Sequence, residues 1–146
     1  MVRQQYHQQE AEKWERRAEA SEDHQKAIQW FLRSARHWGR IGEIGRKGEA
    51  LLKAAKRCIL ISRWNRAERI LRSIRKNRKL RSEQYVKLIT TAWMWTIWLE
   101  AKKGNISRAR RFFFAVQKQF HPSLLPPEWT SLLISVLQDS QKEKEG

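Results

Sequence analysis

The chain has 146 residues, which is enough for one domain with a buried core but too few for two domains of ordinary size. Its 31 Lys and Arg against 15 Asp and Glu give a formal net charge of +16, which favours polyanionic partners such as nucleic acid. The single cysteine, Cys58, excludes an intramolecular disulfide and a thiolate metal cluster, as is typical of a reducing compartment. We therefore expect one domain over residues 1–140, a frayed charged tail over residues 141–146, and a cytoplasmic or nuclear location.

The chain opens with the polar segment "MVRQQYHQQEAEKWERR", which lacks the continuous apolar core of a secretory signal, so we do not expect secretion. The longest apolar run, "TTAWMWTIWL" over residues 90–99, has about half the length that a bilayer crossing requires. It predicts a buried helix, and a membrane is not an expected partner.

Apolar residues recur at helical spacing through most of the chain, and Gly and Pro interrupt this pattern at few places. The apolar stripes cover residues 27–38, 41–59, 64–74 and 109–120. Residues 86–99 are apolar around most of the helix circumference, which predicts a central helix. A last helix should begin at Pro126 or Pro127, where the missing N–H is tolerated. We predict an all-α fold, a compact bundle or short solenoid of about six to seven helices with repeat-like helix hairpins.

Three segments align on an alanine near the start of a helix: Ala27, Ala67 and Ala109, spaced by 40 and 42 residues. Each alanine is followed four positions later by a bulky apolar residue, namely Phe31, Leu71 and Phe113. A small residue lets two helices approach closely while the large one fills the groove behind it. The alignment therefore predicts a repeated helix pair.

The third segment carries a family resemblance, with matching residues at Trp93, Gly104, Asn105, Ala109, Phe113, Val116 and Pro122. Over residues 92–122 it resembles the tetratricopeptide pattern, and "E-x-x-x-G-N-I-x-R-A-R-x-F" is still more similar to the half-a-TPR variant of RNA-processing assemblies. The other two segments carry Glu22 and Ser62 in place of the glycine. The resemblance implies stacked helix hairpins and an interaction role.

The turn within this segment has its own chemistry. Gly104 and Asn105 suit a helix C-terminus that needs positive φ, and Lys102 and Lys103 favour the negative end of the helix dipole. Positive charge opposes the dipole at the start of the next helix, so the arginines there favour an anionic partner.

Positive charge is concentrated in residues 46–81, where 14 Lys and Arg face two acids and give a net charge of +12. The basic residues lie opposite the apolar stripes of two consecutive helices, and "RSIRKNRKLR" over residues 72–81 follows with six basic residues and no acid. Such cations contact phosphates without reading sequence, and their binding depends strongly on salt. The candidate nucleic-acid-binding residues are Arg46, Lys53, Arg57, Arg63, Arg66, Arg69, Arg72, Arg75, Lys76, Arg78, Lys79, Arg81, Arg108, Arg110 and Arg111.

Most of the eight tryptophans fall on apolar stripes and are predicted to be core residues: Trp30, Trp38, Trp64, Trp93, Trp98 and Trp129. Trp14 lies on a polar segment without such a stripe, and Trp95 is ambiguous because its helix is apolar nearly all round.

Catalysis finds little support in the sequence. The four histidines, His7, His24, His37 and His121, are not spaced as metal ligands, and no phosphate loop or catalytic motif is present. We expect no enzyme activity, no cofactor and no small-molecule substrate, and we interpret Cys58 as a core residue.

The predicted function is that of a non-enzymatic, nucleic-acid-binding subunit of a ribonucleoprotein or DNA-associated complex, with other protein subunits as partners. Small basic helical subunits of CRISPR effector complexes are similar in size, class and charge. The alternative is an adapter similar to TPR or half-a-TPR proteins, whose basic face binds an acidic protein or peptide.

Overall fold

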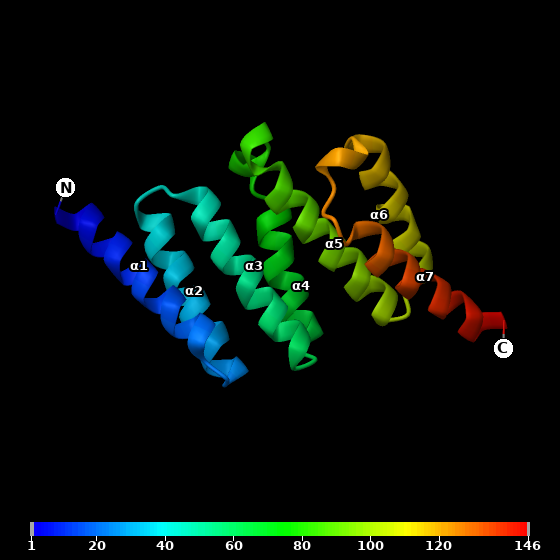
Figure 1. Ribbon diagram of the computed structural model, residues 1–146, viewed down its shortest axis with the longest axis horizontal. Coiled ribbons are helices and arrows are strands. Elements are labelled where there is room, and N and C mark those ends of the chain that lie inside the picture. Colours follow the sequence, from blue (N-terminus) through cyan, green and yellow to red (C-terminus); the bar gives the residue numbers. More distant parts are fainter. Residues whose placement is uncertain (1, 146) are drawn as a thin grey trace. The chain divides into compact units, whose positions relative to one another are not determined.

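The computed structural model describes the backbone of residues 2–145 and the side chains of residues 2–138. This part of the chain forms seven α-helices and three short 3-10 helices, with no strand, which confirms the predicted all-α class (Figure 1). The α-helices are α1 (Val2–Ala20), α2 (His24–Arg40), α3 (Ile44–Leu60), α4 (Trp64–Arg75), α5 (Val86–Lys102), α6 (Ile106–Gln119) and α7 (Trp129–Glu145). The 3-10 helices are η1 (Arg78–Leu80), η2 (Glu83–Tyr85) and η3 (Pro122–Leu124).

The chain divides into two compact units, Met1–Arg81 and Ser82–Gly146. The single domain predicted over residues 1–140 stays a prediction. The backbone of α7 is helical to Glu145, whereas the side chains of the charged tail predicted over residues 141–146 lie outside the described residues. None of the described helices combines the length and the apolar character that a bilayer crossing requires.

The first unit consists of α1 to α4, which pack as consecutive antiparallel helices (Figure 1). Several alanines of these helices are buried, and Ala27 and Ala67 have no exposed surface. Phe31 and Leu71, four positions later, are also buried, as Phe113 is behind the buried Ala109 of the second unit. The small and large residues of the three aligned segments are therefore core residues, as the spacing predicts.

Three turns between helices end in the same way, at a residue with positive φ: Gly42 (75°), Ser62 (58°) and Gly104 (92°). In each turn, the N–H of this residue donates to the carbonyl three positions earlier, and the next N–H donates to the carbonyl five positions before it. This is the Schellman arrangement, which satisfies the last carbonyls of a helix. The positive φ predicted at Gly104 is confirmed, and Ser62 takes the same conformation with a side chain.

Asn105 differs from its prediction, because its φ is −87° and it directly precedes α6. Its side-chain Nδ2 donates to Oε2 of the buried Glu100 at 2.9 Å, and its backbone N–H donates to the Glu100 carbonyl at 2.8 Å. The asparagine thus fastens the turn to α5 instead of supplying a second residue with positive φ.

The second unit is built around α5, which packs against both α6 and α7 and so confirms the predicted central helix. Phe113 of α6 stacks on Trp129 of α7, with ring centroids 5.5 Å apart and an angle of 14° between the planes. The predicted start of the last helix at Pro126 or Pro127 is wrong by two or three residues. The N–H of Trp129 donates to the Pro126 carbonyl at 3.0 Å, so the prolines form a turn before α7.

Candidate nucleic-acid interface

One side of α4 carries three arginines, Arg63, Arg66 and Arg69, at helical spacing of three residues. Together with Ile70 and Ser73 they line an open hollow of about 660 Å³. Arg63 directly precedes α4, and the three cations lie along its N-terminal half, where the backbone N–H groups also present positive potential. Among the residues with described side chains, no carboxylate forms an ion pair with these three arginines. This surface therefore carries three positive charges that no described carboxylate compensates.

The other predicted arginines of α4 are compensated by Glu68, the acidic residue of that helix. Arg72 and Arg75 lie 3.4 and 3.1 Å from its Oε1. Arg75 and Glu68 are largely buried, whereas the side chain of Arg72 is half exposed. The predicted basic stripe is therefore divided into three arginines that form no ion pair with a described carboxylate and two arginines that both pair with Glu68.

The basic segment after α4 is folded, with four cations on its surface. Leu80 is buried and anchors it, and Asn77 Oδ1 accepts a hydrogen bond from the Lys79 N–H at 3.1 Å, which caps η1. The exposed cations are Lys76, Arg78, Lys79 and Arg81. They extend the positive surface of α4 beyond its C-terminus.

Lys53 of α3 does not belong to a free basic stripe as predicted, because it contacts α1. Its Nζ lies 2.9 Å from Glu15 Oε1 and 2.6 Å from Glu19 Oε1. Burial lowers the pKa of the Lys53 ammonium, but the hydrogen bonds and charges of Glu19 and Glu15 outweigh burial and leave the pKa raised. Its charge is thus already compensated within the fold.

Arg57 is engaged in a similar way at the C-terminus of α1. Its guanidinium donates to the carbonyls of Ser21 at 2.9 Å and Ala18 at 3.2 Å, and it lies 3.0 Å from His24 Nδ1. These are the carbonyls that a helix end leaves unsatisfied, so Arg57 caps α1 from a neighbouring helix. Arg46, the third predicted residue of α3, is exposed and lies over the Trp38 ring at 4.9 Å.

The predicted residues of α6 belong to the second unit. Arg108 is exposed and lies over the Phe112 ring at 5.4 Å, Arg111 is exposed, and Arg110 is half-buried. Whether they extend the surface of α4 stays a prediction, because the two units are described separately.

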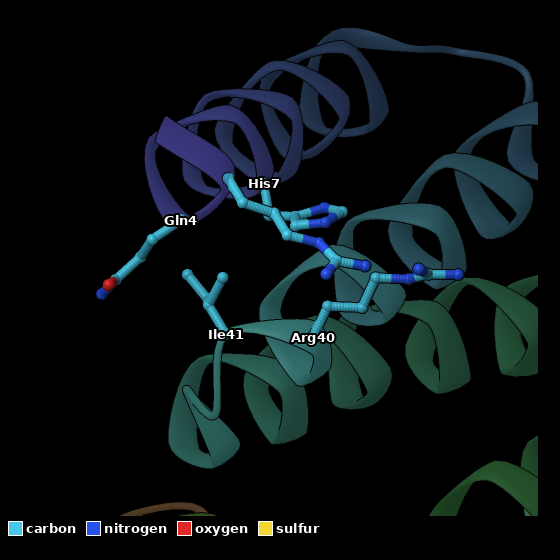
Figure 2. Close-up of a pocket in the computed structure, with 5 residues that line it drawn as sticks. Gln4, His7, Arg40 and Ile41 are labelled. Carbon is cyan, nitrogen blue, oxygen red and sulfur yellow. The ribbon is translucent and has the colours of Figure 1, made fainter. Parts of the chain in front are cut away.

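Two histidines that the sequence did not connect meet between α1 and α2. Nδ1 of His7 lies 2.8 Å from Nδ1 of His37, although the residues are 30 positions apart. An open hollow of about 350 Å³ is lined by both histidines, a second of about 480 Å³ is lined by His7, and Arg40 lines both hollows. Figure 2 shows His7 reaching from α1 and Arg40 from the end of α2 toward the same side, while Gln4 points away.

Trp14, which has no apolar stripe, packs beside Trp30 of α2 with ring centroids 6.3 Å apart. Three cations surround its ring: Arg33 at 4.4 Å, and Lys13 and Arg17 both at 5.0 Å. Cation–π contacts of this kind explain a tryptophan on a polar helix. Of the six tryptophans predicted as core, Trp38 and Trp129 are buried, and the others, Trp30, Trp64, Trp93 and Trp98, are half-buried. The ambiguous Trp95 is half-buried against the core of the second unit.

The described residues contain no group of three His, Cys, Asp or Glu side chains that could hold a metal ion. Cys58 is buried within α3, and burial raises the pKa of its thiol, which keeps it protonated near neutral pH. The interpretation of Cys58 as a core residue fits both observations. Comparisons with protein-family models, curated proteins and solved structures give no match to this chain.

Proposed function

We propose that the chain binds the phosphate backbone of RNA or DNA through α4 and the η1 segment, as a non-enzymatic subunit of a ribonucleoprotein or DNA-associated complex. The observation that carries this proposal is the open hollow lined by Arg63, Arg66 and Arg69, which no described carboxylate compensates. Lys53 and Arg57 are left out of the proposed interface, because α1 already engages both.

The geometry suits a phosphate backbone better than a base edge. Residues 63 and 69 are separated by about 9 Å along a helix, at about 1.5 Å per residue. That distance covers two to three phosphates of one strand, at about 3.4 Å of duplex axis per phosphate. Arginine also donates two parallel hydrogen bonds to phosphate oxygens, so three arginines in line fix a backbone without reading sequence.

A filter-binding titration with mixed-sequence RNA and DNA over about 50 to 200 mM salt tests the proposal. The full chain should bind both at low salt and release them steeply as salt rises. The triple variant R63Q/R66Q/R69Q should bind more weakly and lower the salt slope by about 2 to 3, because each lost phosphate contact removes roughly 0.7 to 0.9 from it.

A matched control removes the same charge elsewhere. Arg16, Lys26 and Lys118 are exposed and belong to no predicted interface, so the variant R16Q/K26Q/K118Q has the same net charge as the test variant. Equal losses in both variants would show that only net charge matters and would overturn the proposed interface. If neither RNA nor DNA binds while an acidic protein does, the adapter alternative replaces the proposal.

A further inference from the structure

The His7–His37 contact lies beside a basic hollow of the first unit. Ser34 Oγ donates to the Ala11 carbonyl at 2.7 Å one turn away, which fixes α1 against α2 beside the pair. His7 is buried and His37 is half-buried. Because the two Nδ1 atoms face each other at 2.8 Å, one ring must donate its proton and the other must accept it.

Cations outnumber acids around this pair. Arg3 and Arg40 line the larger hollow, and Arg33, Arg36 and Arg40 line the smaller one together with Tyr6, which stands edge-on to both imidazoles. The charge of the Glu10 carboxylate raises the pKa of His37. The side chain of Lys47 of α3 lies next to Gly39. The smaller hollow therefore brings three arginines and both imidazoles together, and the larger one adjoins it at His7 and Arg40.

We propose that this recess binds a phosphate group, either as inorganic phosphate or as the phosphomonoester of a nucleotide, and that binding brings one additional proton onto the histidine pair. The arginines supply fixed positive charge and paired donors, as phosphate oxygens require. The hollow is open to solvent beside Tyr6, which is 54% exposed and offers a face on which a base could stack. This site is independent of the proposed nucleic-acid interface on α4.

The proton uptake follows from the electrostatics of the recess. Burial, His7, Arg40 and Arg33 lower the pKa of His37, and Glu10 opposes them. His37 is therefore neutral near pH 7. A bound dianion offsets the positive charge of the arginines and so favours the imidazolium form. The histidine N–H groups then donate to the oxygens of the dianion, and the Nδ1–Nδ1 hydrogen bond is lost.

Side-chain NMR of the four histidines tests the proposal with inorganic phosphate as the probe. Phosphate should shift the His7 and His37 resonances and raise the midpoint of the His37 titration by about one pH unit. His24, which contacts Arg57, and the exposed His121 are internal controls and should not move. Sulfate serves as an additional probe, because it stays a dianion from about pH 5.5 to 8. Any rise in sulfate affinity on acidification should therefore come from protonation of the histidines.

Two single variants locate the site. Arg40→Gln should weaken phosphate binding roughly tenfold, since a charged hydrogen-bond partner is lost from both hollows, whereas Arg16→Gln, at an exposed residue outside both proposed sites, should leave it unchanged. Thermal melts of both variants confirm that they are folded. Equal affinity in the two variants, shifts shared by all four histidines, or the absence of any shift would each overturn the proposal.

The source of the phosphate group is identified by uridine 5′-monophosphate as a second probe. Tighter binding than that of inorganic phosphate, with the gain lost in Tyr6→Ala, identifies a nucleotide. Equal affinity of the two probes identifies a free phosphate. Both results support the site, and because the affinities are read from the His7 and His37 resonances, neither depends on the function of α4.

Discussion

Ser62→Gly tests the turn architecture directly. The left-handed conformation of Ser62, at a φ of 58°, costs a residue with a Cβ roughly 1–2 kcal/mol. Glycine avoids that cost but loses about 0.5–1 kcal/mol through its greater freedom in the unfolded chain. Ser62 is exposed, so its side chain contributes little packing. The variant should therefore gain about 0.5–1 kcal/mol and melt roughly 2–4 °C higher, as measured by circular dichroism.

Two further variants make this test specific. Gly104 has a φ of 92°, and a Cβ built there meets nothing within 4 Å, so Gly104→Ser should lose about 1 kcal/mol through backbone strain alone. Ser73 lies within α4, where glycine is a poor helix former, so Ser73→Gly should lose about 0.5 kcal/mol or more. If Ser62→Gly melts below the parent chain, as Ser73→Gly should, the reasoning is refuted.

The remaining predictions concern packing, capping and pH. Ala109→Leu should lower the free energy of unfolding by about 1–3 kcal/mol in urea titrations. Ala109 has no exposed surface, so a larger side chain there forces α6 away from α5. An unchanged free energy of unfolding would show that the contact tolerates expansion. Arg57→Gln should lose about 1 kcal/mol while Arg66→Gln loses little, and equal losses would contradict the capping role of Arg57. Lowering the pH from about 7.5 to 5.5 should destabilise the chain through His37, because its pKa is lowered on folding and the unfolded chain binds the proton more readily. The stabilisation that the neutral His37 provides is fully present above the ordinary pKa of 6.5 and is lost as the pH falls through the pKa of the folded state. Urea titrations of His37→Gln should therefore lack this pH dependence.

The helices could be predicted because their signals are local. Each apolar stripe repeats within one helix, and the small and large pairs, such as Ala67 and Leu71, occur four residues apart on the same face. The turn at Gly104 was predictable for the same reason, since Gly-Asn marks a helix end. The equivalent turn at Ser62 carried no such mark, because serine seldom adopts positive φ, and only the shared hydrogen-bond pattern connects the two turns.

In the candidate sites, too, local arrangements could be predicted from the sequence, whereas long-range contacts could not. Arg63, Arg66 and Arg69 are three residues apart on one helix, so their common face follows from the sequence. The partners of Lys53 and Arg57 lie 33 to 39 positions away on and just after α1, and His7 lies 30 positions from His37. No helical periodicity connects residues that are brought together by packing between helices, so these contacts could not be predicted.

The placement of α1 explains why the basic surface lies where it does. The first 23 residues carry six acids, and Glu15 and Glu19 of this set are bound to Lys53, while the carbonyls at the end of α1 take up Arg57. Thus α1 compensates two cations of α3, whereas Glu68 is the carboxylate that pairs with arginines of α4. The net charge of the chain is therefore a poor guide to its binding surface. Within the first unit, α1 takes up the charges of Lys53 and Arg57, whereas Arg63, Arg66 and Arg69 form no ion pair with a described carboxylate and stay available to a partner.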